Sequence, residues 1–314
     1  MGAERVSITF LYGPRYFAPV RYLALFFKTL LILSRRRPDV VYAQNPPVFC
    51  PLTCMLYCSL TRKRLVIDHH SIWRIKTLGG GPVSKLIGFL EGVVSRAAAG
   101  NTTPHTFWAE KLKAMGANRV LVVHDFVEKN PNLRDEALRR SFTERPMVAI
   151  CSHGGHPLER IEAEAAAVGR VGTVELLITG PREKLERRLS ERTLPDNVRY
   201  LGFLPRQTYE SLKASADMAI NVTDEPFTLS HVLLEYASSS LPVISSRQEV
   251  LEDFFGDALL FTDSSDPEEI ARKVRMMQEA AIRDEYRKRM TRWYEGLSAS
   301  RQSELQALRS LLTP

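Results

Sequence analysis

Glu235 is the residue in this sequence whose surroundings most clearly require a partner. It lies in the segment 228–246, TLSHVLLEYASSSLPVISS, among apolar residues of a predicted helix and one helical turn after His231. A carboxylate on a mostly buried helix needs hydrogen-bond donors, and the two hydroxyls of a sugar or ribose suit its two oxygens. The simpler interpretation is a solvated helix acid, and the spacing alone favours neither.

Two other segments with polar residues directly follow predicted apolar strands. The sequence DHH occupies positions 68–70 after the run 64–68, and SHGGH occupies 152–156 after the run 147–151. An imidazole at a strand end can donate, accept or carry charge near neutral pH. The adjacent glycines 154 and 155 lie after a predicted strand and before a predicted helix. Hydrogen-bonded loop histidines and a plain tight turn are the structural alternatives.

Predicted strands and helices alternate along the chain, which indicates parallel α/β sheets. The segment 219–246 reads as strand, loop, helix and strand, which is one βαβ unit. In such sheets ligands bind beyond the carboxyl ends of the strands. In the first half those predicted ends carry Asn45, Asp68, His69, His70, Thr103 and His124.

We therefore predict an α/β protein with two Rossmann-like, doubly wound domains that face each other across a cleft. The first domain is predicted at 1–128, beginning with a strand at 5–12. A polar linker follows at 129–146, and the second domain is predicted at 147–290. The segment 291–314 is predicted as a C-terminal helix that packs back on the first domain. A length of 314 residues suffices for two ordinary hydrophobic cores.

The charge is distributed unevenly. Residues 1–145 hold 22 Lys and Arg against 10 Asp and Glu, a net of +12, whereas 146–314 hold 21 against 26, a net of −5. A basic half suggests an anionic partner. Because the sequence contains no DNA- or RNA-binding motif, a nucleic acid is not expected. The very apolar predicted helix within 16–37 ends in three arginines and suits an anionic membrane surface. A buried crossover helix is the alternative.

The cysteines predict neither a disulfide framework nor a metal site. Cys50, Cys54 and Cys58 fall on one helical stripe, and Cys151 is distant in sequence. Small buried thiols in a reducing compartment fit this spacing better than zinc ligation. No signal peptide is evident at the charged start of the sequence, so the expected location is the cytoplasm, as a peripheral protein at the cytoplasmic face of a membrane.

Four segments resemble the retaining GT-B glycosyltransferases of the large family-four type, and more narrowly the branch of the chitobiosyl-diphosphodolichol mannosyltransferases. They are PDVVYAQNPP (38–47), LVIDHHS (65–71), VRYLGFLPRQTYESLKASADMAI (198–220) and TLSHVLLEYASSSLPVISS (228–246). The similarity extends over nearly the whole chain, and the last segment is the most characteristic.

The resemblance implies a nucleotide-sugar donor held mainly by the second domain. Glu235 matches the glutamate that binds the ribose hydroxyls, Gly154 and Gly155 match the turn at the diphosphate, and Gly180 matches a glycine near the base. It implies no metal and no cofactor. The predicted site residues are His70 and Asp68 as catalytic residues; His153, Gly154, Gly155, Gly180, Thr228, Ser230, His231 and Glu235 at the donor; and Asn45 and His69 on the acceptor side.

The sequence departs from the family pattern at three places. The paired glutamates eight residues apart are absent, because Phe227 stands at the first position. The Arg and Lys that usually neutralise the diphosphate are absent too, with His153, His156 or Arg160 as substitutes. The first domain is expected to be short by one βα unit.

The predicted function is transfer of a sugar from a nucleotide-sugar to a hydroxyl of a glycan or lipid-linked acceptor, with retention, by an enzyme of the hexosyltransferase type. The departures favour an alternative: a non-catalytic subunit of a glycosylation complex that binds the nucleotide-sugar or acts as a scaffold. A sugar-nucleotide epimerase is a third hypothesis.

Overall fold

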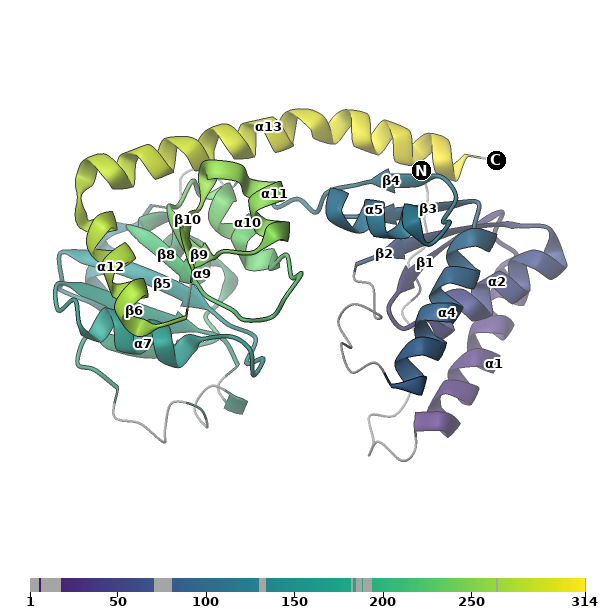
Figure 1. Ribbon diagram of the computed structural model, residues 1–314, viewed down its shortest axis with the longest axis horizontal. Helices are drawn as coiled ribbons and strands as arrows, with labels where there is room; N and C mark the ends of the chain where they lie inside the picture. Colours follow the sequence, from purple (N-terminus) through teal and green to yellow (C-terminus); the bar gives the residue numbers. More distant parts are fainter. Residues whose placement is uncertain are drawn as a thin grey trace. The chain divides into compact units, whose positions relative to one another are not determined.

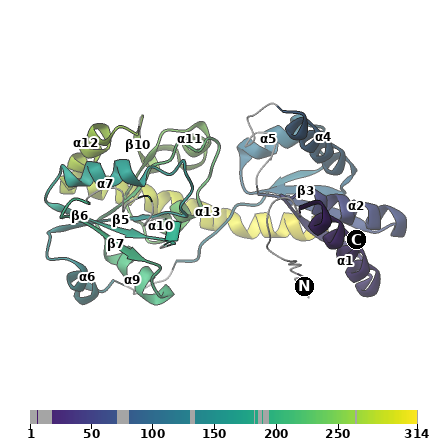
Figure 2. The same ribbon diagram turned by 90° about the horizontal axis from the view of Figure 1, so that it is seen from below.

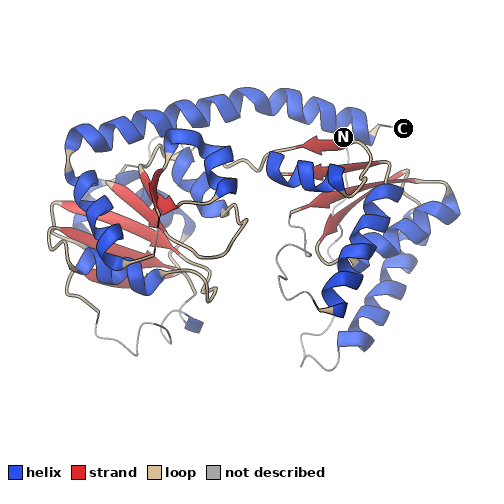
Figure 3. Cartoon of the chain, viewed as in Figure 1, coloured by secondary structure: helices blue, strands red, loops and turns tan. Residues whose placement is uncertain are grey.

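The computed structural model describes residues 6, 18–70, 81–129, 134–181, 183–184, 188, 194–263 and 265–313. The strand predicted at 5–12 lies outside these residues except for position 6. The chain forms two compact units, one of Met1–His124 with Ser300–Pro314 and one of Asp125–Ala299, here named the first and second domain. In each, helices surround a sheet (Figure 3).

The first domain contains a parallel sheet whose four described strands follow chain order, β1-β2-β3-β4 (Figure 1). In the register of this sheet Asn45 lies beside His69, and Asp68 lies beside Thr102. The polar residues at these strand ends therefore share one edge, as predicted. The elements are α1 (Ala18–Arg36), β1 (Val40–Asn45), α2 (Phe49–Thr61), β2 (Arg64–His69), α4 (Pro82–Ala97), β3 (Gly100–Thr103), α5 (Thr106–Ala114) and β4 (Val120–Val122).

The cysteine stripe explains how α2 packs. Cys54 and Cys58 are buried with Tyr57 against β1 and β2, and all four cysteines of the chain are free thiols. Helix α1 lies beside α2 and turns Leu30 and Leu33 toward the same core (Figure 1). Its opposite side is a second apolar stripe that faces solvent, so the alternative of a fully buried crossover helix is wrong.

The second domain contains a six-stranded parallel sheet in the order β10-β9-β8-β5-β6-β7. The chain first builds the sheet outward from β5 to β7 and then returns to the other side of β5 with β8. This doubly wound order creates a switch point between β5 and β8. The elements are α6 (Glu136–Phe142), β5 (Met147–Ser152), α7 (Ile161–Gly169), β6 (Val174–Thr179), β7 (Val198–Gly202), α9 (Arg206–Ser215), β8 (Met218–Asn221), α10 (His231–Ser238), β9 (Val243–Ser246), α11 (Glu249–Phe255), η2 (Gly256–Ala258), β10 (Leu260–Thr262), α12 (Pro267–Gln278) and α13 (Ala280–Leu312).

The core of the second domain consists of the central strands and the helices that cover them. Every residue of β6 is buried, and α7 turns Ile161, Ala165 and Val168 toward this core. Helices α7 and α12 pack together on one face of the sheet, and α6 and α9 on the other (Figure 2). Each fully buried Ile or Leu contributes about 1.5–3 kcal/mol of transfer free energy, so these strands form a rigid platform for the loops at their ends.

Segments at the domain boundary form regular structure. The stretch 129–146, predicted as a linker, contains α6, and Arg139 of α6 pairs with Asp217 of the second domain. In the last turns of α13, Leu311 packs so closely on Gly100 that a Cβ added there would overlap the Leu311 side chain. Within the first domain, Glu304 of α13 accepts hydrogen bonds from the backbone N–H and ring of His124, which lies just after β4.

Among the residues that the structure describes, no helix combines the length and the apolarity needed to cross a bilayer.

Candidate nucleotide-sugar site

The loops that follow β5 and β8 are bound to each other at the switch point. Glu159 and Thr223 form an antiparallel bridge. On either side of it, the N–H of Arg160 donates to the carbonyl of Val222 at 2.9 Å, and the N–H of Asp224 donates to the carbonyl of Leu158 at 2.9 Å. The two strand ends that would border a ligand therefore share one hydrogen-bonded rim.

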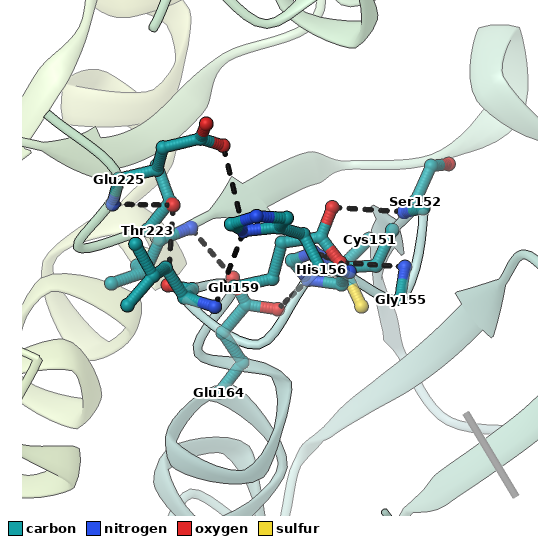
Figure 4. Close-up of polar contacts among 12 residues, drawn as sticks. Cys151, Ser152, Gly155, His156, Glu159, Glu164, Thr223 and Glu225 are labelled. Carbon is teal, nitrogen blue, oxygen red and sulfur yellow. Dashed lines mark hydrogen bonds and ion pairs between the residues drawn. The ribbon is translucent and has the colours of Figure 1, made fainter. Parts of the chain in front are cut away.

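The Gly-Gly turn after β5 binds an anion, and that anion is a side chain of the same chain. The N–H groups of Gly154, Gly155 and His156 all donate to the Glu159 carboxylate, over 2.9, 2.8 and 2.9 Å (Figure 4). Three successive donors that converge on one carboxylate form the concave arrangement that binds phosphate in other proteins. In this structure the turn binds the Glu159 carboxylate, and its contact with a donor diphosphate stays a prediction.

Gly155 is required for this turn for two reasons. Its φ is +79°, a left-handed conformation in which side chains with a Cβ are strained. A Cβ at this position would also lie 2.7 Å from Cβ of Lys184. The second glycine of SHGGH is therefore set by local geometry, whether or not a ligand binds.

Beneath the turn lies a fully buried ion pair. His153 Nε2 and Glu164 Oε2 are 2.6 Å apart with both side chains inaccessible to solvent, and Glu164 Oε1 accepts the N–H of Val222 at 2.6 Å. Burial alone would lower the pKa of His153, but the carboxylates of Glu164 and Glu159 outweigh it and raise that pKa. The two carboxylates thus favour the protonated ring of His153, and the His153–Glu164 pair joins the end of β5 to α7 and to Val222 after β8.

Cys151 adds a sulfur to this pair, and the donor atoms of Cys151, His153 and Glu164 lie within 4.8 Å of one another, a spacing compatible with a metal ion. The chemistry does not fit one. Burial and the nearby Glu164 raise the pKa of the Cys151 thiol well above its usual value, which favours the protonated form. Nε2 of the imidazole already binds the Glu164 carboxylate, so this cluster is a buried ion pair beside a protonated thiol.

Glu235 is joined to the end of β5 through a tyrosine. The Tyr209 hydroxyl donates to Glu235 Oε2 at 2.9 Å and lies 3.1 Å from the Ser152 hydroxyl, which in turn lies 2.7 Å from Thr179 Oγ1. Burial and the Glu235 charge raise the pKa of Tyr209, so its proton stays in place as a donor. Glu235 is partly exposed, and the chain from Tyr209 to Ser152 connects it to the switch-point strand.

The other predicted donor residues lie in two places. Gly180 follows β6, donates to the carbonyl of Gly202 and accepts from Tyr200. Ser230 is the N-cap residue of α10 without a side-chain cap, and His231 beside it is exposed. Among described residues no recorded contact joins Thr228, Ser230 or His231 to the Gly-Gly turn.

Three basic side chains near the turn, those of Arg160, His156 and Arg188, lie close to acids or carbonyls. Arg160 forms an ion pair with Asp224, and His156 Nδ1 lies 3.6 Å from a Glu225 oxygen. Arg188 was not predicted: it forms a bidentate pair with Glu162 over 2.6–2.7 Å and donates to the carbonyls of His156 and Glu159. Arg188 therefore binds carbonyl groups of the turn, while the Glu159 carboxylate binds its N–H groups.

In the first domain, the two predicted catalytic residues contact each other. Asp68 Oδ2 lies 2.8 Å from His70 Nε2, and Asp68 Oδ1 accepts from the Thr102 hydroxyl at 2.9 Å. Burial would raise the pKa of Asp68, but the bonds from His70, Thr102 and Tyr42 outweigh this and lower it. Asp68 is thus an ionised carboxylate that orients a partly exposed imidazole.

The two residues predicted on the acceptor side are buried beneath that pair. Asn45 Nδ2 lies 3.2 Å from His69 Nδ1, and His69 Nε2 lies 3.0 Å from Asn101 Oδ1. Since the Asn45 amide nitrogen also donates to Glu91, His69 Nδ1 is the acceptor and Nε2 carries the proton. Burial lowers the pKa of His69 and favours this neutral form. In this structure both side chains fix the ends of β1 and β2 and present no surface to a ligand.

Sequence reasoning did not identify Glu159, Glu164, Tyr209 or Arg188. Glu164 shares the helical stripe of Ile161, which would have placed it on the buried face of α7. Glu159 follows a Gly-Gly turn by four residues, a spacing at which an acid can reach back to free N–H groups as in a capping box. No local pattern indicated Tyr209 or Arg188.

Comparison with known proteins gives matches over both domains. Residues 155–279 match the family model described as "Glycosyl transferases group 1", and residues 2–125 match "Glycosyl transferase 4-like domain". A search of curated proteins finds no match.

Solved structures with a similar fold cover nearly the whole chain. HepE of Anabaena in complex with UDP-glucose is 14% identical, with 91% of this chain and 82% of that chain covered at a TM-score of 0.72. Sucrose-phosphate synthase from Thermosynechococcus elongatus is 15% identical, with 95% and 81% covered at a TM-score of 0.74. A UDP-forming α,α-trehalose-phosphate synthase from Burkholderia xenovorans is 12% identical, with 94% and 80% covered at a TM-score of 0.72. At these identities the likeness is one of fold.

Proposed function

We propose that this chain, which carries the two domains of a GT-B glycosyltransferase, transfers a sugar from a nucleotide-sugar donor to an acceptor hydroxyl. The observation that carries the proposal is the link from Glu235 through Tyr209 to Ser152 at the carboxyl end of β5. Nucleotides bind at such switch points in doubly wound sheets. The binding of UDP-glucose by HepE, which has a similar fold, supports a nucleotide-sugar as the donor.

In the proposed reaction Glu235 accepts hydrogen bonds from both ribose hydroxyls, and the turn Gly154–His156 lies at the diphosphate. Backbone N–H groups stabilise the charge that develops on a leaving diphosphate. Asp68 and His70 form an oriented carboxylate–imidazole pair that supports charge at the anomeric carbon. These groups supply the charge stabilisation without a metal or a cofactor, so transfer should persist in EDTA. Retention of configuration and membership of the mannosyltransferase-like branch belong to the same proposal.

The Glu235→Ala variant tests the donor site. Losing a pair of charge-assisted hydrogen bonds should weaken nucleoside diphosphate binding by roughly 10- to 100-fold. The measurement is isothermal titration calorimetry with UDP, GDP and ADP. Glu268→Ala, which removes an exposed acid on α12, is the matched control and should bind like the wild type. Unchanged affinity in the Glu235 variant would show that the nucleotide site is elsewhere.

A non-catalytic subunit that binds the nucleotide-sugar is the second candidate. The contacts of Arg160 with Asp224 and of His156 with Glu225 favour it, because both side chains already have acidic neighbours and are not left open for a diphosphate. Release of nucleoside diphosphate from a panel of UDP-, GDP- and ADP-sugars, with and without lipid-linked acceptors, separates the two candidates. Binding without turnover on the whole panel would favour the subunit.

The proposed acceptor side includes an anionic membrane surface, and α1 is the element that fits it. On α1, Val20, Leu23, Phe27 and Leu31 recur at helical spacing and are 49–63% exposed. They form an apolar stripe along the solvent side of the helix, which ends in the basic residues 35–37. An exposed apolar stripe next to cations is the pattern of helices that lie in the interface of anionic bilayers. Such a surface would bring a lipid-linked acceptor to the enzyme.

Co-sedimentation with vesicles tests the membrane surface. Each basic residue near an anionic leaflet contributes about 1 kcal/mol, so neutralising Arg35, Arg36 and Arg37 to Gln should reduce binding to phosphatidylglycerol vesicles about 100-fold. Neutralising Lys111 and Lys113 on α5 serves as the control in the same domain and should change binding little. Equal losses in both variants would indicate a diffuse charge effect and would contradict a surface on α1.

A further inference from the structure

The carboxylate of Glu159 occupies the anion-binding turn formed by the N–H groups of Gly154, Gly155 and His156. Its two oxygens accept all three N–H groups of the Gly154–His156 turn at 2.8–2.9 Å. These are the same donors that the proposed function assigns to the donor diphosphate. A diphosphate and a carboxylate would repel each other at this distance and compete for the same protons. The diphosphate can use this turn only when Glu159 gives it up.

A second partner for Glu159 lies next to the first. Nδ1 of His153 is buried and has no hydrogen-bond acceptor within the described part of the chain. It lies 3.7 Å from Glu159 Oε2, just beyond hydrogen-bond distance. The other ring nitrogen is bound to Glu164, which fixes the ring and leaves Nδ1 available to a nearby carboxylate. A rotation of the Glu159 side chain that brings Oε2 about one ångström closer to Nδ1 would form a charge-assisted hydrogen bond there.

We propose that Glu159 sets the affinity of the donor: its carboxylate is an internal anion that occupies the amide turn when the site is empty and moves to His153 Nδ1 when a diphosphate binds. This inference rests on the proposed function, and it assigns to Glu159 a role in regulating the same site. The turn is kept in its binding conformation by Glu159, which avoids leaving three N–H groups without acceptors.

The exchange predicts a weakened apparent affinity for diphosphates. The observed dissociation constant equals the intrinsic one divided by the fraction of molecules in which the turn is open. Removing the internal anion should therefore tighten binding of any ligand with a diphosphate, by roughly tenfold or more. It should not tighten binding of a nucleoside, which has no group for the turn. This selectivity separates a competing anion from a side chain that only supports the fold.

Calorimetric titration of Glu159→Ala and Glu159→Gln with UDP, GDP, inorganic pyrophosphate, uridine and guanosine tests the inference. The alanine variant should bind pyrophosphate and nucleoside diphosphates most tightly, the glutamine variant should be intermediate, and nucleoside affinities should match the wild type. Glu225→Gln is the control, because it removes the same charge beside His156 without touching the three amides. It should change diphosphate affinity less than about threefold, as expected for a partly screened charge.

Equal or weaker diphosphate binding by both Glu159 variants would overturn the inference and leave Glu159 as a structural cap of the turn. Thermal unfolding of each variant identifies a loss of fold, and the glutamine variant, which keeps the side-chain shape, then decides the result. If the wild type binds UDP or GDP, the Glu235→Ala variant binds it more weakly, and the Glu159 variants bind it no more tightly than the wild type, only this inference fails. If no form binds any nucleotide, the proposed function fails with it.

Discussion

Replacing Glu164 by Gln should destabilise the second domain strongly, and more at low pH than at high pH. Glutamine keeps the shape of the side chain and can still accept the N–H of Val222, but its amide cannot neutralise the buried imidazolium of His153. Removing one partner of a buried ion pair costs about 3–5 kcal/mol when the other keeps its charge. If His153 instead loses its proton, the cost falls to that of a charged hydrogen bond, about 1.5–3 kcal/mol.

The pH dependence follows from the direction of the His153 shift. In the wild type its pKa is raised above 6.5 by Glu164 and Glu159 against the effect of burial. A raised pKa contributes stability that is fully present below the unfolded value of about 6.5 and is lost as pH rises through the folded value. In the variant the buried ring has lost its strongest counter-charge. The difference in unfolding free energy between the two proteins should therefore be larger at pH 6 than at pH 9.

Urea denaturation followed by circular dichroism measures this difference. With an m-value of about 2 kcal/mol per molar urea, a loss of 3–5 kcal/mol lowers the midpoint by roughly 1.5–2.5 M at pH 6. Glu162→Gln is the matched control: it is the same change two residues away on α7, where the pair with Arg188 is about one-fifth exposed. It should cost about 1 kcal/mol or less. A loss in Glu164→Gln that is below 1 kcal/mol, or that does not vary with pH, would refute the charged-pair description of His153.

Three other outcomes are expected. Gly100→Ala should lower the free energy of unfolding by about 1–3 kcal/mol in urea denaturation, because the added Cβ would overlap Leu311. Leu311→Ala in the same chain should recover part of that loss. Additive losses in the double variant would contradict the contact between Gly100 and the end of α13. Cys50 should react with a thiol reagent before Cys54. Their hydrogen bond lowers the pKa of Cys50, whereas the same bond and burial raise the pKa of Cys54. Equal labelling rates would contradict the contact between the two thiols. Asp68→Asn should lower sugar transfer roughly 10- to 100-fold in a donor-release assay with little loss of stability, and unchanged turnover would remove the carboxylate–imidazole pair from the proposed mechanism.

The alternation of apolar runs and helical patterns was sufficient to predict both α/β domains, because central strands such as β5, β6 and β8 are buried on two faces and read as nearly continuous apolar segments. The order of the strands in the second sheet could not be predicted from these patterns. The reversal at β5 depends on where β8 pairs, which is a contact between segments about 70 residues apart in sequence. The helix α6 within 134–146 was hidden by the polar composition of the stretch, since a short surface helix needs few apolar residues.

The sequence was sufficient to locate polar residues at strand ends, such as Asp68 and the Gly-Gly turn, because they directly follow apolar runs. It did not indicate which side chains contact one another, because such contacts depend on three-dimensional distance. His69 and His70 are adjacent in sequence, yet one is buried with Asn45 and the other contacts Asp68. Alternation along an extended strand end sends neighbouring side chains to opposite sides, so only one histidine of the pair could reach the edge of the sheet.

The three acids near the end of β5 differ in how much of their hydrogen-bonding capacity the chain itself uses. Glu164 is fully buried and neutralised by a cation, and Glu159 accepts three N–H groups. Within the described residues, the Glu235 carboxylate accepts one bond, from the neutral phenol of Tyr209, and its side chain is partly exposed. A carboxylate has about four acceptor positions and gains most from donors that reach it outside bulk water. Of these three acids, Glu235 has the greatest remaining capacity for a diol, and this inequality, rather than its place in a motif, is the physical reason to assign the ribose to it.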